Sequence, residues 1–179
     1  VVDGFSRDRS RAIAEQYGVK VLECSGGLLE ARFRGFQASR GDFIMLVDAD
    51  QVLRRDTVER AVQTVEEGGY DMLVLEEHSW HYCRGFIQTL YKASKKLINM
   101  RIGEEWAFEP GRGFFVPRFF RRTLLEKAFN AIPKSLIPKV IHYDHDIIYY
   151  ECWKISRRIG IVRDAVYHIE PDWRKLWRT

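Results

Sequence analysis

The sequence is poor in the features that define disulfide-rich, zinc-binding and membrane-spanning proteins. Its 179 residues include three cysteines, which are far apart and form no CxxC pair, so neither a disulfide framework nor a cysteine zinc site is indicated. Five prolines and 13 glycines are too few for a collagen-like or low-complexity chain. No uninterrupted apolar run approaches the ~18 residues that a transmembrane helix needs. We therefore expect a globular protein with reduced thiols.

The chain also lacks a strong excess of either charge. It has 29 Lys and Arg against 25 Asp and Glu, a net charge of +4, and acidic residues interrupt the basic ones throughout, so we expect no nucleic-acid partner. The arginines suit a phosphate-bearing ligand. What the chain does have is 46% hydrophobic and 13% aromatic residues. This is enough for one core, and we expect a single domain over residues 1–179.

Strand-like and helix-like segments alternate over the first 80 residues. This alternation predicts an α/β fold with a mostly parallel central sheet flanked by helices. The apolar run at 43–47 is predicted to be a central, buried strand. In such sheets ligands bind beyond the carboxyl ends of the strands. Asp3 and Asp48 each end a predicted strand, so we expect the site at that edge.

Beyond residue 80 the pattern is less regular. Residues 84–101 form an amphipathic stretch, with Phe86 and Leu97 on its apolar side and lysines on the other. We favour packing of this helix on its own domain over a membrane-surface role. A last long helix is expected at 146–159, and short strands at 161–170.

Asp48 and Asp50 directly follow the apolar run at 43–47. Residues two apart in an extended chain point the same way, roughly 6.5–7 Å apart, and a turn brings them closer. Two such carboxylates can hold one Mg²⁺ or Mn²⁺ that also takes oxygens from a diphosphate. The cation would neutralise a departing nucleoside diphosphate. The pair is common on protein surfaces, but its place at the end of a strand favours a metal site.

Five segments of the chain resemble, in order, the motifs of the inverting family 2 glycosyltransferases of the GT-A fold. They are VVDGFSRDRS (1–10), EARFRG (30–35), MLVDAD (45–50, the DxD motif), HYDHDI (142–147) and AVYHIEP (165–171). The resemblance implies a GT-A-like nucleotide-diphospho-sugar transferase domain of hexosyltransferase type, N-terminally truncated. It further implies a nucleotide-sugar donor, Mg²⁺ or Mn²⁺, and inversion at the anomeric carbon. Residues 1–80 would be the nucleotide-sugar-binding half and 81–170 the acceptor-side half.

The resemblance assigns donor and metal contacts residue by residue. Asp3 would lie near the donor's base, and Arg32 near its base or phosphates. Asp48 would approach the ribose or the metal, Asp50 would be the principal metal ligand, and His168 would complete the metal shell or bind a phosphate oxygen. Structural alternatives remain open for three of them. Asp3 could cap the first helix, Arg32 could be a solvated helix residue, and His168 could be a hydrogen-bonded strand histidine.

The resemblance also implies a catalytic base. Asp144 would take the proton of the acceptor hydroxyl, and Asp146 is its rival. One of the two is expected to be the N-cap of the last long helix, where the helix dipole favours the charged form of Asp146 and so weakens it as a base. The neighbouring His142 and His145 make a zinc site conceivable, but the segment lacks the helical HExxH spacing.

Aromatic residues and glycines lie close together in the expected acceptor-side half. Gly111, Arg112 and Gly113 fit the acceptor-side loop of the family, where glycines let the backbone approach a sugar or a phosphate; a plain turn is an equal alternative. Trp106 and Phe108 could stack on a sugar ring, although core packing is favoured for both.

Departures from the motifs and the composition of the C-terminus leave other functions open. Gly4, Phe5 and Tyr143 replace motif residues, which gives weight to a catalytically impaired scaffold domain at a membrane. A sugar-phosphate nucleotidyltransferase is a second alternative. Residues 171–179 combine tryptophan with basic residues, which is typical of a membrane-proximal helix. We therefore expect a sugar or lipid-linked acceptor, a membrane surface as a further partner, and a location in the cytoplasm or on the cytoplasmic face of the membrane.

Overall fold

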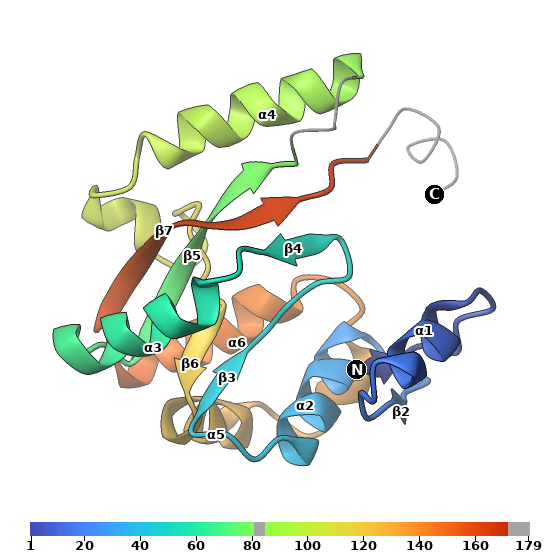
Figure 1. Cartoon of the computed structure of the whole chain (residues 1–179). Helices are drawn as coiled ribbons and strands as arrows, with labels where there is room; N and C mark the ends of the chain where they lie inside the picture. Colours follow the sequence, from blue (N-terminus) through green and yellow to red (C-terminus); the bar gives the residue numbers. More distant parts are fainter. Residues whose placement is uncertain (81–84, 172–179) are drawn as a thin grey trace. The chain divides into compact units, whose positions relative to one another are not determined.

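The computed structural model describes residues 1–80 and 85–171 (Figure 1). The chain divides into two compact units, each made of two segments. The first unit comprises Val1–Ile44 and Arg121–Arg157, and the second comprises Met45–Phe120 and Arg158–Thr179. This division does not follow the functional boundary expected at residue 80. The assignment of donor and acceptor roles to 1–80 and 81–170 stays a prediction.

The first unit is mostly helical. Its elements are β1 (Val2–Asp3), α1 (Ser10–Gln16), β2 (Leu22–Glu23), α2 (Leu28–Ala38), α5 (Arg122–Ala131), the 3-10 helix η2 (Ile137–Lys139) and α6 (Asp144–Ile155). β1 and β2 pair in parallel, α5 packs on α6, and α2 contacts β1, η2 and α6. Apolar side chains fill this unit, including Leu29, Phe36, Leu125, Phe129, Ile148 and Tyr149. Their burial holds α2 against α6.

Helix α6 begins earlier than the sequence predicts. It starts at Asp144 and ends at Ile155, and Tyr143 precedes it with a left-handed backbone (φ 58°). Asp144 and Asp146 therefore both lie in the first turn, and the expectation that one of them is the N-cap is wrong. The chain turns extended at Ser156 (φ −146°, ψ 140°), so the helix stops before the end predicted at residue 159.

The second unit is built on a sheet. Its elements are β4 (Gln51–Leu53), α3 (Thr57–Gly68), β5 (Met72–Ser79), α4 (Phe86–Asn99), the 3-10 helix η1 (Glu105–Phe108) and β7 (Ile159–His168); β3 (Phe43–Met45) and β6 (Phe119–Arg121) lie at the ends of its first segment. The strand order is β3-β6-β5-β7-β4. α3 packs on β7 and α4 on β5; in the view of Figure 1, α4 lies above the β5–β7 pair and α3 below it.

The strand directions are mixed. β5 runs parallel to β7, whereas β4 is antiparallel to β7 and β6 is antiparallel to β5. The α/β class with helices flanking a central sheet is confirmed, and the β5–β7 pair is parallel as expected; the β4–β7 and β5–β6 pairs are antiparallel and make the sheet mixed. The run at 43–47 forms a three-residue strand at the edge of the sheet, and β5 takes the centre. Alternating apolar segments predict strands but do not encode their order or direction.

Helix α4 turns part of its apolar surface outward. Phe86 and Leu97 are exposed, whereas the expectation was that this face packs on the domain. The helix carries apolar residues on two sides, and Ile98 packs against the core beneath. Lys95 points inward and pairs with Glu77 at 3.2 Å. Because a largely buried carboxylate needs a partner, this ion pair helps to fix the rotation of α4.

Two further expectations concern thiols and membrane segments. Cys24 and Cys152 are buried and free, as expected of reduced thiols, and Cys83 lies outside the described residues. Within 1–80 and 85–171, no helix combines the length and the apolarity that crossing a bilayer requires. From residue 172 onward, the predicted membrane-proximal segment also lies outside the described residues.

Candidate active site

Asp48 and Asp50 lie in the turn between β3 and β4, in the second unit. The Asp48 carbonyl accepts a hydrogen bond from the Gln51 backbone N–H at 3.1 Å, and the Gln51 side-chain oxygen accepts one from the Asp48 N–H at 2.9 Å. The Asp50 side chain is 52% exposed and that of Asp48 30%. Gln51 therefore fixes the backbone of the turn, and the two carboxylates meet different partners.

Asp48 is paired with Arg118. One guanidinium nitrogen lies 2.9 Å from the Asp48 Oδ2. The Arg118 backbone is held on both sides, since its carbonyl accepts from the Leu46 N–H at 2.8 Å and its N–H donates to the Leu73 carbonyl at 2.9 Å. The arginine is thus a fixed positive charge beside the turn, and it takes up at least one Asp48 oxygen.

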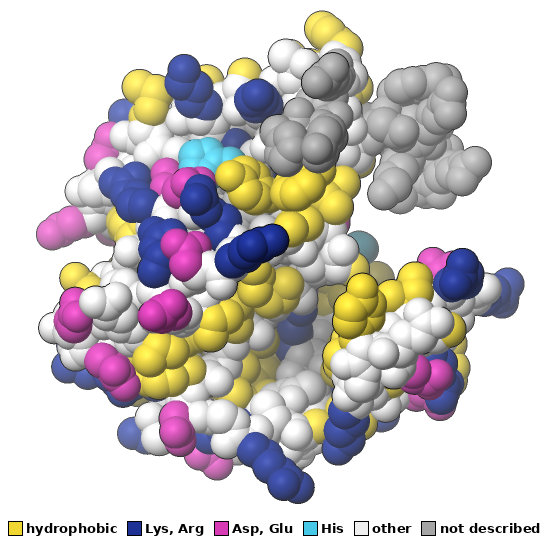
Figure 2. All heavy atoms as spheres, in the orientation of Figure 1, with side chains coloured by type: hydrophobic (Ala, Val, Ile, Leu, Met, Phe, Trp, Pro, Cys, Tyr) yellow, Lys and Arg dark blue, Asp and Glu magenta, His cyan; other side chains and the backbone are white. Residues whose placement is uncertain are grey.

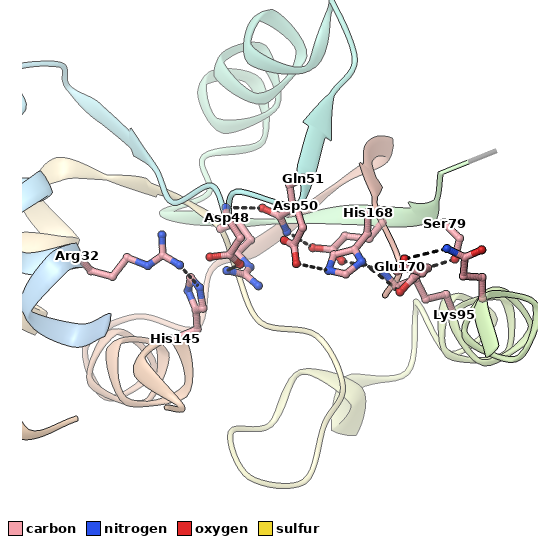
Figure 3. A network of polar contacts seen from close by, with 12 residues as sticks. Arg32, Asp48, Asp50, Gln51, Ser79, Lys95, His145, His168 and Glu170 are labelled. Atoms are coloured by element: carbon pink, nitrogen blue, oxygen red, sulfur yellow. Dashed lines mark hydrogen bonds and ion pairs between the residues drawn. The ribbon is translucent and has the colours of Figure 1, made fainter. Parts of the chain in front are cut away.

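Asp50 lies beside His168, at the end of β7. The antiparallel pairing of β4 with β7 sets Gln51 opposite His168, and the Ile169 N–H donates to the Asp50 carbonyl at 2.8 Å. This register leaves His168 Nε2 3.4 Å from Asp50 Oδ2, while His168 Nδ1 lies 3.1 Å from a Glu170 oxygen (Figure 3). The structure thus brings together two of the three predicted metal ligands.

The side chains around the turn offer few ligands to a divalent cation. Among residues 1–80 and 85–171, no group of three or more His, Cys, Asp or Glu side chains is placed to hold a metal, so Asp48, Asp50 and His168 do not form a three-ligand site. Asp50 and His168 offer one oxygen and one nitrogen. Mg²⁺ and Mn²⁺ are commonly held by one or two protein ligands together with phosphate oxygens and water. The pair therefore fits a cation shared with a diphosphate.

In the first unit, Arg32 and Asp144 form a largely buried ion pair. Arg32 Nε on α2 lies 3.1 Å from Asp144 Oδ2, and Arg32 Nη2 lies 2.8 Å from His145 Nε2. The Asp144 side chain is only 5% exposed, whereas Asp146, two residues on, is exposed. Two charged groups so far from water need each other. The candidate base Asp144 is therefore held by an arginine, and the alternative base Asp146 lies at the surface.

Asp3 ends β1 and stabilises the turn that follows. Its Oδ2 accepts a hydrogen bond from the Ser6 N–H at 3.1 Å, and hydrogen bonding to Ser6 lowers the pKa of the Asp3 carboxyl below its usual value. Phe5 in this turn has a left-handed backbone (φ 62°). Asp3 does not cap α1, since that helix begins at Ser10.

The segment Gly111-Arg112-Gly113 is a tight turn after η1. Gly111 has a positive φ of 80°, and the Gly113 N–H donates to the Glu109 carbonyl at 2.7 Å. A Cβ atom on Gly113 would lie 2.1 Å from the Ala107 carbonyl oxygen. Arg112 is exposed and pairs with Glu109 at 3.0 Å. The turn accounts for both glycines, and the acceptor role of this loop stays a prediction.

The aromatic residues of η1 are part of the core. Trp106 packs edge-on against Phe114 with ring centroids 5.5 Å apart, and Phe108 packs against Phe115 at 5.3 Å. Both Trp106 and Phe108 pack against the buried cluster that includes Val74. The core interpretation, favoured over sugar stacking, is confirmed.

Several polar residues around the turn, Arg118 among them, were not predicted from the sequence. Gln51 donates to Glu77, and Glu77 pairs with Lys95. Glu170 contacts His168 (Figure 3). Glu170 could have been identified from the sequence, because residues two apart in an extended chain face the same side and His168 was already a candidate site residue. No local sequence pattern marks the other polar residues, because they meet their partners only after the chain has folded.

The fold is that of the GT-A glycosyltransferases. The chain matches the structure of Staphylococcus aureus TarS 1-349 in complex with UDP with a TM-score of 0.67 and 20% identity, over 95% of this chain and 50% of that one. It matches glucosyl-3-phosphoglycerate synthase from Mycobacterium tuberculosis in complex with Mn²⁺ and UDP-Glc with a TM-score of 0.61 and 20% identity, over 99% and 62%. At these identities the likeness is one of fold.

The sequence defines the family. The model of glycosyl transferase family 2 matches residues 1–129, and the chain belongs to this family. It is 22% identical over 197 residues to glycosyltransferase GlyG of Streptococcus pneumoniae (100% of this chain, 62% of GlyG). It is 30% identical over 178 residues to poly(ribitol-phosphate) beta-N-acetylglucosaminyltransferase TarS of S. aureus (94% and 29%). The chain thus spans less than two thirds of the length of these relatives.

Proposed function

We propose that the chain carries out the inverting, metal-dependent transfer of a hexosyl group from a nucleoside-diphosphate donor to an acceptor hydroxyl. Family membership and structural neighbours that hold UDP, UDP-GlcNAc and UDP-Glc support this proposal. The observation that carries it is the Asp50–His168 pair, an oxygen and a nitrogen donor 3.4 Å apart in a half-exposed turn. Such a pair suits a cation that bridges the protein and a diphosphate.

In this proposal Asp50 and His168 hold Mg²⁺ or Mn²⁺, which when bound supplies Lewis-acid stabilisation of the departing diphosphate. Asp48, whose carboxylate is already paired with Arg118, is assigned to the ribose and not to the metal. The Arg118 guanidinium adds positive charge beside the turn, where the leaving group gains negative charge. The donor is thereby bound and oriented by groups whose positions do not depend on its arrival.

Asp144 is the proposed general base. The Arg32 Nε lies 3.1 Å from its Oδ2, and this contact fixes the direction of the carboxylate. The acceptor hydroxyl gives its proton to this carboxylate while its oxygen attacks the anomeric carbon from the side opposite the diphosphate. Inversion follows from that direction of attack. Asp146 is the alternative base.

The remaining predicted contacts are proposed in the same way. Asp3 and Arg32 are donor contacts of the first unit, and Arg32 would serve the donor while it holds Asp144. Gly111, Arg112 and Gly113 form an acceptor-side loop of the second unit, where the exposed Arg112 can meet an anionic acceptor.

Release of UDP from UDP-GlcNAc and UDP-glucose, with and without Mn²⁺, tests the proposal. Asp50→Ala and Asp144→Asn are each expected to lower turnover by roughly 10²- to 10⁴-fold, since one removes a metal ligand and the other the base. Asp56→Asn is the matched control, because Asp56 is an exposed carboxylate at the start of α3. Metal-independent turnover, or full activity of Asp50→Ala, would refute the metal role. Activity that survives Asp144→Asn but is lost in Asp146→Asn would make Asp146 the base.

The two alternative functions predict different outcomes. A sugar-phosphate nucleotidyltransferase would form pyrophosphate from a sugar phosphate and a nucleoside triphosphate. A catalytically impaired scaffold domain would bind UDP without releasing it from any donor. Either result would replace the proposed transfer.

We also propose that α4 contacts a membrane surface and that the acceptor is lipid-linked, at the cytoplasmic face. Phe86, Leu90, Leu97 and Met100 are exposed on or next to this helix. The helix also carries two exposed lysines, at positions 92 and 96, and no acidic residue. Figure 2 shows hydrophobic side chains among Lys and Arg side chains along the upper edge of the face drawn, where α4 runs in Figure 1. Exposed apolar residues beside lysines suit anionic lipids.

Vesicle sedimentation tests this contact. Binding to phosphatidylglycerol vesicles, and weaker binding to phosphatidylcholine vesicles, is expected for the wild type and should be lost in Leu97→Asp. Ile13→Asp is the control, because Ile13 is also an exposed apolar helix residue but lies on α1. Equal losses in both variants, or self-association through α4 in solution, would count against a membrane role.

A further inference from the structure

Glu170 is a buried acid with three side-chain partners. Its side chain is 1% exposed. One carboxylate oxygen accepts a hydrogen bond from Ser79 Oγ at 2.8 Å and lies 3.1 Å from Lys95 Nζ. The other oxygen lies 3.1 Å from His168 Nδ1. The backbone is also held, since Gln88 donates to the Glu170 carbonyl at 3.1 Å. Glu170 is therefore fixed by strand β5, helix α4 and its own segment.

These contacts determine which ring nitrogen of His168 carries the proton. One Glu170 oxygen already faces two donors, the Ser79 hydroxyl and the Lys95 ammonium, and the other oxygen is offered to His168 as a hydrogen-bond acceptor. The nitrogen that faces it, Nδ1, is therefore the N–H of the neutral ring. Nε2 is then the nitrogen with a lone pair, and it is the one that lies 3.4 Å from Asp50 Oδ2 (Figure 3).

We propose that Glu170 is the positioning residue of the metal site: held by Ser79 and Lys95, it fixes His168 as the Nδ1–H tautomer and aims Nε2 at the place beside Asp50 where a divalent cation binds. The inference rests on the proposed function for the identity of the site. Ligating histidines that donate their other N–H to a carboxylate bind metal more tightly, because the carboxylate sets both the tautomer and the ring orientation. Lys95 extends this support to α4.

Mn²⁺ affinity measured by electron paramagnetic resonance, with Mn²⁺ alone and with Mn²⁺ plus UDP, tests the proposal without any turnover. Glu170→Gln is expected to weaken binding about 10- to 100-fold. Glu76→Gln is the matched control, because Glu76 is also a buried glutamate of the second unit and does not contact His168. The control should bind Mn²⁺ as the wild type does.

A double variant separates positioning from general damage. If Glu170 acts through His168, then Glu170→Gln adds nothing to the loss already caused by His168→Asn. Additive losses would show that Glu170 acts by another route and would overturn the proposal. Ser79→Ala offers a milder perturbation of the same carboxylate should Glu170→Gln fail to fold, and it is expected to weaken Mn²⁺ binding by a smaller factor.

The tautomer can be read directly in the wild type. Nitrogen-15 chemical shifts of the neutral His168 ring, recorded at alkaline pH, should show the proton on Nδ1, and in Glu170→Gln a mixture of tautomers. A proton on Nε2 in the wild type, or no Mn²⁺ binding with or without UDP, would overturn the inference. If the tautomer and the Mn²⁺ effect are found but no donor is turned over, the proposed transfer fails and the positioning role of Glu170 stands.

Discussion

Arg32 on α2 and Asp144 at the start of α6 face each other at 3.1 Å, with Asp144 almost fully shielded from water. They are 112 positions apart in the chain, so the contact joins two distant segments of the first unit. Removing one charge of a buried pair leaves the other without compensation, which costs more than the pair itself contributes. The same contact therefore contributes to the stability of the first unit and orients the proposed catalytic base.

Arg32→Met is expected to lower the free energy of unfolding by about 3–5 kcal/mol, because it strands the Asp144 carboxylate in the interior. The double variant Arg32→Met/Asp144→Leu should recover most of this loss, since it replaces both charges with apolar groups. Urea unfolding followed by circular dichroism measures both. A double variant as unstable as the single one would contradict this account of the pair.

Asp48→Asn and Asp50→Asn are expected to differ in their effect on the metal. Asp50 faces His168 in a half-exposed turn, whereas Asp48 is paired with Arg118. Asp50→Asn should weaken Mn²⁺ binding at least tenfold and Asp48→Asn by a smaller factor. Isothermal titration calorimetry with MnCl₂ distinguishes the two variants. Equal losses of Mn²⁺ affinity would mean that both carboxylates ligate the metal.

Gly113→Ala should destabilise the second unit more than Gly111→Ala does. At position 113 the new methyl group would lie 2.1 Å from the Ala107 carbonyl oxygen, whereas at position 111 nothing lies within 4 Å and only the positive φ of 80° opposes alanine. We expect losses of about 2–3 kcal/mol for Gly113→Ala and about 1 kcal/mol for Gly111→Ala. Thermal and urea unfolding give the order, and the reverse order would rule out the steric explanation.

Stability should fall at alkaline pH because of Cys152. Burial raises the pKa of this thiol to about 12, and the neighbouring Glu151 adds to the shift. The unfolded thiol ionises near its ordinary pKa of about 8.5, so the stabilising contribution is complete below that pH and is lost as the pH rises toward 12. The slope in this window is about 1.4 kcal/mol per pH unit for one proton. Urea unfolding at pH 8, 9 and 10 should show a shallower slope for Cys152→Ala than for the wild type.

The overall class was predictable because its signals are local. Strand and helix periodicities indicated an α/β protein, and five motifs in the right order indicated the glycosyltransferase family. The proximity of Asp50 to His168 was anticipated from the motifs that contain them. Such features follow from residues that are neighbours in the sequence, or from a pattern that covers nearly the whole chain.

The arrangement of the strands and several partners was not predictable. An apolar run such as 43–47 forms a strand equally well at the centre or the edge of a sheet, and here it lies at the edge. Arg118 meets Asp48 across 70 positions, and no local pattern marks such a pair. Helix α4 has apolar residues on two sides, so its orientation depends on the acids that bind Lys95, which only the folded chain brings together.

The ammonium group of Lys95 is shared by Glu77 and Glu170, at 3.2 and 3.1 Å. A neutral residue at position 95 would remove the ammonium group that both acids share, and loss of one acid would leave the lysine with a single ion-pair partner. During evolutionary drift these three positions are therefore constrained to change in concert. A homologue that has exchanged the lysine is expected to have exchanged one of the acids as well.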